Sequence, residues 1–330
     1  MEAYVIIARR QVLQFVAAAP LLALQSQRAA AQAYPTRPVR VIVTTGPGGQ
    51  SDTTARLVAA KLTESLGQSF YIENMPGGGG NIAMAAAARA APDGYTLLGA
   101  TSNLVTNISL YPKIPYDPYK DFEPISLMCS SPHVLVVHPS VPAQSANELV
   151  ALAKASPGKY SYGSAGRGTP AHLAGELFKL ALGVDITHVP FNGGGPATAS
   201  TLGGHVPISV SALPTAVTYI RGGQLRALGM FSSKRSSALP DVPSMMEATG
   251  HELPADIVNG FMVPAGTPKA IIEFLHRETG KVMSMPDTRD KLATMGFDPV
   301  ASTPEEFAQW IRSEIVRWGK VIRDANIALQ

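Results

Sequence analysis

The chain has 330 residues but only one cysteine, and charged residues make up just 15% of it. A single cysteine excludes an internal disulfide, and since no lipobox cysteine stands directly after the N-terminal apolar run, a lipid anchor is not expected. Low charge together with 45% hydrophobic residues excludes a disordered chain and indicates a well-buried α/β protein of one or two domains. The cysteine, Cys129, lies in an apolar stretch, so we expect it in the core.

Long hydrophobic runs are missing after the N-terminus. The one such run, Val12 to Leu24, follows Arg9-Arg10 and is too short to span a bilayer as a helix. Ala31-Gln32-Ala33 then gives an A-x-A cleavage pattern. We therefore expect residues 1–33 to be a signal peptide of the Sec or twin-arginine type, cleaved near Ala33, and the mature protein to lie outside the cytoplasmic membrane.

An excess of charge of one sign is also missing. The formal net charge is +3, and removal of residues 1–33 takes away three arginines and one glutamate, which lowers it to +1. A nucleic-acid partner is therefore not expected.

Patterns for metal, cofactor or covalent chemistry are incomplete. No His, Asp, Glu or Cys residues have metal-ligand spacing, so neither a metal nor another cofactor is expected. Gly46-x-Gly48-x-x-Ser51 lacks the third glycine of a dinucleotide fingerprint. Gly163-Ser164-Ala165-Gly166 has no residue between the first glycine and the serine, so it is not the nucleophile elbow of a serine hydrolase.

Glycine, in contrast, is abundant and gathers in four turns, three of which follow a strand pattern and enter a helix pattern directly. The turns are Gly46–Gly49, Pro76–Gly80, Gly166–Pro170 and Gly193–Pro196. A strand-to-helix turn leaves backbone N–H groups at the positive end of the helix dipole, which is a seat for an anion. We favour ligand binding at the first and third turns and close packing at the second, and leave the fourth open between the two.

The periodicity of the chain predicts two α/β halves, each with a mostly parallel sheet flanked by helices. Strand and helix patterns alternate from Val39 to Ala100, and a second alternation runs from Tyr160 to Phe231. A strand near Ile257 to Val263 returns to the first sheet, and three helices finish the chain. We expect lobe 1 to comprise residues 34–133 and 255–330 and lobe 2 to comprise residues 134–254, with a ligand cleft between them.

Short motifs in one collinear order from about Tyr34 to the C-terminus resemble a known family. They are Pro35-x-x-Pro38, Gly48-Gly49-x-x-Asp52, Glu73-Asn-x-Pro-Gly77, Gly79-Gly80-Asn81, Ala91-Pro-Asp-Gly-Tyr95, Pro115-Tyr-Asp-Pro118, His172-Leu-Ala-Gly-Glu176, His188-Val-Pro190, Leu239-Pro-Asp-Val-Pro243 and Thr303-Pro-Glu-Glu306. Each is weak alone, but the ordered set is specific. The chain resembles the TctC/Bug-type receptors, the extracytoplasmic solute-binding proteins of tripartite tricarboxylate transporters.

This resemblance implies a two-lobed Venus-flytrap fold, a periplasmic location, and a small carboxylate held by backbone amides and water at facing strand–helix turns. The ligand-binding positions it implies are Pro47, Gly48, Gly49, Asp52, Ser102 and Asn103 in lobe 1, and Ser164, Gly166, Gly168, Thr169, Phe191, Asn192, Gly193, Gly194 and Ser211 in lobe 2. Arg167, in the third glycine turn, is a further candidate. For Arg167 a solvated side chain is favoured over a clamp on a second carboxylate. Family members often have an acidic residue near Ser211; since serine cannot balance a ligand ammonium, a di- or tricarboxylate or aromatic acid is expected instead of an amino acid.

The function expected from these features is that of a monomeric, non-enzymatic receptor that delivers a carboxylate to the membrane subunits of such a transporter. Two alternatives stay open. One is a ligand-sensing accessory of a two-component system, and the other is an exported α/β enzyme acting on a carboxylated substrate.

Overall fold

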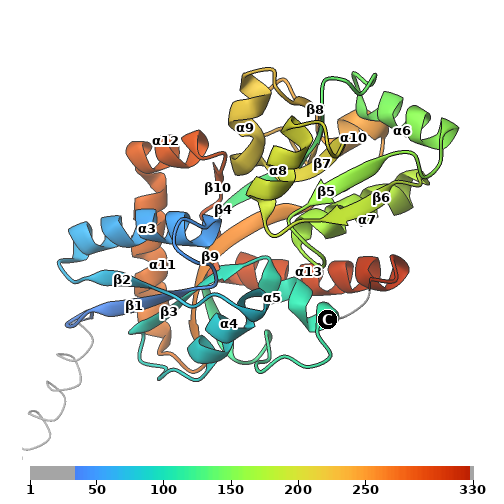
Figure 1. Cartoon of the computed structure of the whole chain (residues 1–330). Coiled ribbons are helices and arrows are strands. Elements are labelled where there is room, and N and C mark those ends of the chain that lie inside the picture. Colours follow the sequence, from blue (N-terminus) through green and yellow to red (C-terminus); the bar gives the residue numbers. More distant parts are fainter. Residues whose placement is uncertain (1–33, 328–330) are drawn as a thin grey trace, which may run out of the picture.

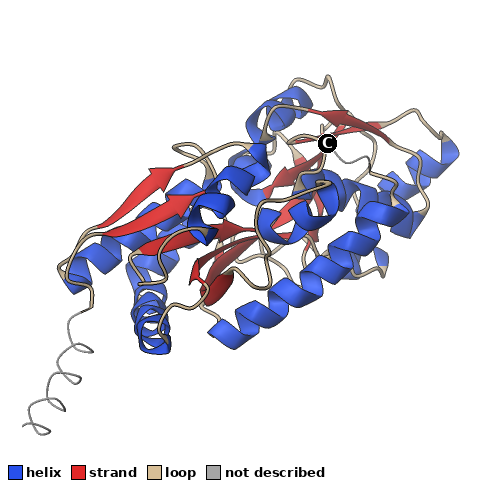
Figure 2. Ribbon diagram, turned by 90° about the horizontal axis from the view of Figure 1, so that it is seen from below, coloured by secondary structure: helices blue, strands red, loops and turns tan. Residues whose placement is uncertain are grey.

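The computed structural model describes residues 34–327, which form an α/β protein of two lobes joined through one mixed sheet (Figure 1). Along the sheet the strands follow the order β2-β1-β3-β9-β4-β7-β5-β6, and β8 and β10 pair with β4. Seen from below, the strands lie in the middle of the molecule and the helices lie around them (Figure 2). This confirms the predicted fold class. The expected signal peptide lies outside the described residues.

Lobe 1 contains the β2-β1-β3-β9 part of the sheet and its helices. Its elements are β1 (Val39–Val43), α3 (Gln50–Leu66), β2 (Phe70–Asn74), η1 (Gly78–Gly80), α4 (Asn81–Ala88), β3 (Thr96–Thr101), α5 (Asn103–Leu110), β9 (Asp256–Pro264), α11 (Lys269–Ser284), α12 (Pro286–Thr294), β10 (Asp298–Pro299) and α13 (Pro304–Asp324). β1 pairs in parallel with β2 and β3, and its β-branched residues Val39, Val41, Ile42 and Val43 are all buried, which is typical of a parallel strand. Gly67 ends α3 in the left-handed conformation, φ 68°, which glycine adopts without a steric penalty.

Lobe 2 contains the β7-β5-β6 part of the sheet. Its elements are α6 (Ala146–Ala155), β5 (Ser161–Ser164), α7 (Pro170–Leu182), β6 (Thr187–Pro190), α8 (Gly194–Leu202), β7 (Ile208–Ala212), α9 (Leu213–Arg221), β8 (Arg226–Phe231) and α10 (Met245–Thr249). β5 pairs in parallel with β6 and β7. Each of these three strands leads into a helix, so the helix N-termini lie at the same edge of the sheet.

Two antiparallel strands connect the lobes. β4 (Phe122–Val137) pairs with β9 up to Pro132 and with β7 and β8 from His133 onward. The sequence predicts two separate strand-like runs here, Ile125 to Met128 and Val134 to His138, with Pro132 between them. The structure instead has one strand in which the proline marks the change of partner, a position where a missing N–H is tolerated.

The hydrophobic core continues from one lobe to the other. One buried cluster includes Met84 and Leu98 of lobe 1 together with Tyr162 and Phe178 of lobe 2. α13 supports this continuity, since it packs against α5 of lobe 1 and α7 of lobe 2 (Figure 1). Cys129 is buried in a second cluster, as predicted. Within residues 34–327, no helix combines the length and apolar character needed to cross a membrane.

Candidate functional site

A cavity of about 400 Å³ lies between the two lobes. Its wall is formed by residues from both: Thr44, Thr45, Gly48, Gly49, Gln50, Ser51, Thr101, Ser102, Asn103, Ile257 and Asn259 of lobe 1, and His133, Ala165, Thr169, Pro170, Ala171, Gly194, Val210, Ala212 and Thr215 on the lobe 2 side. None of these lining residues is Asp, Glu, Lys or Arg. The volume and the mixed polar and apolar wall are typical of a small-molecule site.

Five helix N-termini meet at this cavity. The lining residues include first-turn or N-cap positions of α3, α5, α7, α8 and α9. In α3, the first main-chain bond after the cap runs from the Thr53 N–H to the Gly49 carbonyl, at 2.9 Å, so the N–H groups of Gln50 and Ser51 precede the helical ladder. The cavity therefore has a positive potential without a charged side chain.

The buried Asp52 side chain holds the first glycine turn in place. One carboxylate oxygen accepts the Gly48 N–H at 2.9 Å, and the other accepts the Asn74 amide N–H at 2.8 Å. Burial opposes ionisation of this carboxyl, but its hydrogen bonds from Arg56, Asn74 and Gly48 outweigh that effect and lower its pKa. Gly49 must be glycine, because a Cβ there would lie 2.6 Å from the Thr45 Oγ1.

The third glycine turn is fixed by the start of α7. Thr169 caps that helix, with its Oγ1 accepting the His172 N–H at 3.4 Å, and His172 Nδ1 accepts the Gly168 N–H at 3.0 Å. Since Nδ1 accepts a hydrogen bond, the ring is neutral here, and burial lowers its pKa. His188 stacks on His172 at a centroid distance of 3.9 Å and bonds Ser164 Oγ at 2.7 Å. The two histidines thus support the loop from behind.

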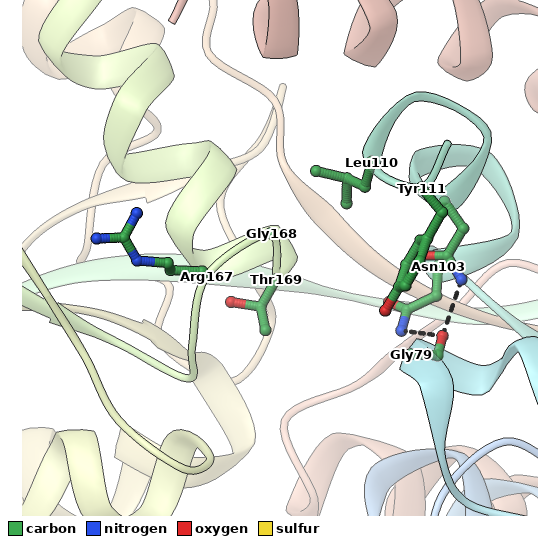
Figure 3. Close-up of a pocket in the computed structure, with 8 residues that line it drawn as sticks. Gly79, Asn103, Leu110, Tyr111, Arg167, Gly168 and Thr169 are labelled. Carbon is green, nitrogen blue, oxygen red and sulfur yellow. Dashed lines mark hydrogen bonds between the residues drawn. The ribbon is translucent and has the colours of Figure 1, made fainter. Parts of the chain in front are cut away.

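A smaller pocket of about 70 Å³ shares Asn103 and Thr169 with this cavity (Figure 3). Gly168 and Thr169 of lobe 2 lie on one side of it and Leu110 and Tyr111 of lobe 1 on the other. Figure 3 shows the exposed Arg167 side chain extending away from these lobe 1 residues.

The expected ligand-binding residues fall into two groups in the structure. Those that line the large cavity or the smaller pocket are Gly48, Gly49, Ser102, Asn103, Arg167, Gly168, Thr169 and Gly194. The others do not line the cavity. Pro47 and Asn192 are exposed, whereas Asp52, Ser164 and Ser211 are buried and hydrogen-bonded within the protein. The Gly166 N–H donates to Ser164 Oγ, Phe191 packs over Gly163, and Gly193 caps α8.

Several cavity residues were not expected from the sequence. Asn259 is 2% exposed, and among the described residues neither its amide nitrogen nor its amide oxygen has a hydrogen-bond partner. The Oγ1 atoms of Thr44 and Thr45, where the chain leaves β1, also lack partners in this part of the structure. Buried polar groups usually have partners, so these atoms are suited to a ligand or to ordered water.

Another unexpected residue is His133. It is 3% exposed, and burial lowers its pKa to about 4, so it is neutral at physiological pH. Both His133 and Asn259 occupy buried positions of strands that cross between the lobes. The strand pattern alone does not distinguish such positions from ordinary core.

The remaining chemistry of the site is limited. Among residues 34–327, no group of three or more His, Cys, Asp or Glu residues is placed to hold a metal ion. Ser164 is fully buried, and its hydroxyl is committed to His188 and the Gly166 loop, so it does not face the cavity as a nucleophile would.

Two lobes, two crossing strands and an amide-lined cavity between the lobes define a solute-binding protein of the periplasmic type. The chain belongs to the TctC family, the tripartite tricarboxylate transporter family receptors, whose model matches residues 54–327. The resemblance seen in the sequence motifs is thereby confirmed.

Individual relatives agree with this assignment. The chain is 38% identical over 302 residues to Protein BugT of Bordetella pertussis, covering 91% of this chain and 93% of that protein. Among solved structures it is similar to R. palustris Rpa4515 with adipate, at 34% identity and a TM-score of 0.81, covering 90% of this chain and 100% of the other. MatC (Rpa3494) from Rhodopseudomonas palustris with bound malate gives 33% identity and a TM-score of 0.75, covering 88% and 100%.

Proposed function

We propose that this protein is a non-enzymatic receptor that binds a small carboxylate in the interlobe cavity and delivers it to the membrane subunits of a tripartite tricarboxylate transporter. The observation that carries the proposal is the convergence of five helix N-termini on a cavity with no charged residue in its wall. Main-chain N–H groups at helix N-termini bind carboxylates with good geometry. Gly48, Gly49, Ser102, Asn103, Gly168 and Thr169 are the predicted residues that remain candidates for direct contact.

The cavity favours a carboxylate without an ammonium group. An amino acid would bring a positive charge into a cavity that has no acidic residue in its wall, and Ser211 forms its hydrogen bonds with Thr198 and Ser209 instead. Val210 and Ile257 supply an apolar section of wall that suits the chain or ring between polar ends. Similar proteins have been solved with adipate and with malate, which supports a dicarboxylate or a related acid.

Delivery requires that the ligand favours one conformation of the receptor. The connection through β4 and β9 supports a movement of residues 134–254 against residues 34–133 and 255–330, the division expected from the sequence. Closure would bring the α3 turn and the α7 turn onto the same carboxylate. The location we propose is the periplasm, reached after cleavage of residues 1–33, with the receptor acting as a monomer.

The test is titration calorimetry on the purified mature protein. The panel contains succinate, adipate, malate, citrate and benzoate, with aspartate and glutamate as amino-acid comparisons. One-to-one binding of a carboxylate with recovery of unchanged ligand supports the receptor. Chemical turnover of the ligand would favour an exported enzyme. A membrane-transport defect after gene deletion, with signalling intact, would separate the transport role from that of a sensor.

A matched pair of variants tests the main-chain contact itself. Gln50 is the first residue of α3, and Gly49 before it is extended, at φ −68° and ψ 162°, so proline fits at position 50 without breaking the helix. Gln50→Pro removes one N–H, whereas Gln50→Ala removes the side chain and keeps that N–H. We expect the proline variant to bind the preferred carboxylate about 10-fold or more weakly, since a hydrogen bond to a charged group contributes about 1.5–3 kcal/mol. The alanine variant should stay within about 3-fold of wild type, and equal effects of the two variants would contradict the proposal.

A further inference from the structure

His133 is a hydrogen-bond acceptor in a cavity wall to which the helix N-termini present main-chain donors. The His133 Nδ1 lies 2.6 Å from the Ala255 carbonyl oxygen. A carbonyl can only accept, so Nδ1 carries the proton of this hydrogen bond. In the neutral ring the other nitrogen, Nε2, then has a lone pair and can only accept.

This tautomer is fixed by the fold. Ala255 is held in place by its own N–H, which donates to the Phe231 carbonyl at 2.8 Å, and His133 is opposite Ala212 and Phe231 in the sheet. No hydrogen bond to the His133 Nε2 is found among residues 34–327. The ring is almost completely buried and also lines the cavity, so the cavity is where that nitrogen can find a donor.

The lone pair of Nε2 repels a carboxylate oxygen, because both atoms are hydrogen-bond acceptors. A ligand group beside Nε2 must therefore donate. An ammonium group donates but would remain without a countercharge, since none of the residues lining the cavity is acidic. A carboxylic acid would have to stay protonated at neutral pH. A hydroxyl group donates, carries no charge and can also accept from the surrounding amides.

We infer that His133 is a specificity-determining residue that selects carboxylates bearing a hydroxyl group over the same carboxylates without one. The inference rests on the proposed function and adds the chemical class of the ligand. Its physical basis is asymmetric: a ligand with the hydroxyl satisfies a buried acceptor, whereas the unsubstituted ligand displaces water from that acceptor and leaves it without a partner.

The experiment compares affinities within matched pairs at pH 7.5. The pairs are malate and succinate, 2-hydroxyglutarate and glutarate, 4-hydroxybenzoate and benzoate, and 6-hydroxyhexanoate and hexanoate, which place the hydroxyl near the carboxylate or far from it. Wild type should prefer the hydroxylated member of at least one pair by about 10-fold, equivalent to about 1.4 kcal/mol. In His133→Phe this preference should fall to within about 2-fold, with affinity for the unsubstituted member changed less than about 3-fold. The same substitution at an exposed histidine, His251→Phe, should leave the preference unchanged.

His133→Phe also leaves the Ala255 carbonyl without its donor, so folding is checked by circular dichroism. Should that variant not fold, His133→Gln serves, because its amide can donate to Ala255 and its preference should lie between wild type and none. Measuring the binding enthalpy in two buffers of different ionisation enthalpy gives the number of protons that the protein takes up when the ligand binds. We expect no proton uptake.

The outcomes separate this inference from the proposed function. If carboxylates bind but no pair shows a hydroxyl preference, or the preference survives in His133→Phe, the inference is wrong and the receptor proposal stands. Uptake of one proton on binding would also overturn it, since His133 would then act as a cation for a carboxylate. If no carboxylate in the panels binds, both proposals fail.

Discussion

Replacement of Asp52 should both destabilise the protein and weaken ligand binding, although its carboxylate does not line the cavity. It accepts hydrogen bonds from two largely enclosed donors, the Gly48 N–H and the Asn74 amide, besides its contact with Arg56, and its side chain is only 3% exposed. Each such bond to a buried charged acceptor contributes about 1.5–3 kcal/mol. The contact with Arg56 at 2.9 Å adds less than about 1 kcal/mol, because that side chain is 50% exposed.

Asp52→Ala should therefore lower the free energy of unfolding by about 3–5 kcal/mol, measured by urea denaturation. Asp52→Asn keeps one acceptor oxygen but presents an N–H to the second donor, so we expect a loss of about 2–3 kcal/mol. Affinity for the preferred carboxylate should fall about 10-fold in both variants, because the turn at Gly48 loses the anchor that holds its amides in place. The matched control is Asp287→Asn, a 52% exposed carboxylate paired with Lys61, which should leave the urea midpoint unchanged within experimental error.

The pH dependence gives an independent check on the role of Asp52. Its pKa is lowered in the folded state, so its contribution to stability is present above the ordinary aspartate pKa and is lost as pH falls through the lowered value. The stability difference between wild type and Asp52→Asn should be largest near pH 7 and shrink below about pH 4. Equal stabilities of wild type and Asp52→Ala at pH 7, or undiminished affinity in that variant, would refute the reasoning.

Three further predictions concern single residues or small groups. Asn259→Leu should raise the unfolding free energy of the ligand-free protein by about 1 kcal/mol, because it removes two buried polar atoms without partners. It should also weaken carboxylate binding at least 10-fold. Calorimetric melting measures the first effect and titration calorimetry the second, and a loss of stability would contradict the role of Asn259 as a ligand-binding residue. Arg167→Ala should change affinity for each panel carboxylate by less than about 2-fold, since the side chain extends away from the lobe 1 wall, and a 10-fold loss would establish a clamp. Burial lowers the pKa of His133 to about 4 and that of His188 to about 3, so the unfolded state binds more protons than the folded state below about pH 6.5. The free energy of unfolding, measured by urea denaturation, should therefore fall from pH 7 to pH 5. A free energy that does not change with pH would contradict this prediction.

Local signals in the sequence predicted most of the fold. The Thr303-x-x-Glu306 pattern predicts a capping box, and these two residues form one at α13; Thr169 caps α7, with Pro170 in its first turn. At α6 the agreement is partial. Ser145-x-x-Glu148 has the same capping-box pattern, and Ser145 Oγ accepts the Glu148 N–H, but the glutamate side chain accepts from the N–H of Gln144 and not from that of Ser145.

The elements that sequence reasoning missed depend on tertiary contacts. α5 is a single short helix, and its buried Asn107 donates hydrogen bonds to the Gly79 carbonyl and to Asn81, so its stability comes from neighbours distant in the chain. α10 lies between Ser232 and Pro254, a stretch whose serines and prolines predict mostly loop, although Ser244 and Glu247 close a capping box there. Both helices are too short for hydrophobic periodicity to identify them.

The candidate site divides in the same way. Glycine turns and helix starts can be read locally, and they led to Gly48, Gly49 and Thr169, which line the cavity. The contributions of His133 and Asn259 could not be anticipated, because an alternating strand pattern identifies a buried face without revealing whether that face meets protein or an internal space. Only the placement of β4 and β9 between the lobes distinguishes the two cases.

The convergence of helix starts on the cleft has a consequence for how such receptors diversify. Main-chain N–H groups recognise the negative end of a solute. Substitutions of side chains elsewhere in the cavity wall can therefore accumulate without abolishing this recognition. New nutrients can then be acquired by exchanging one or two neighbouring side chains while the anchoring function is inherited intact. Overall sequence identity between two such proteins should accordingly be a poor guide to whether they import the same compound.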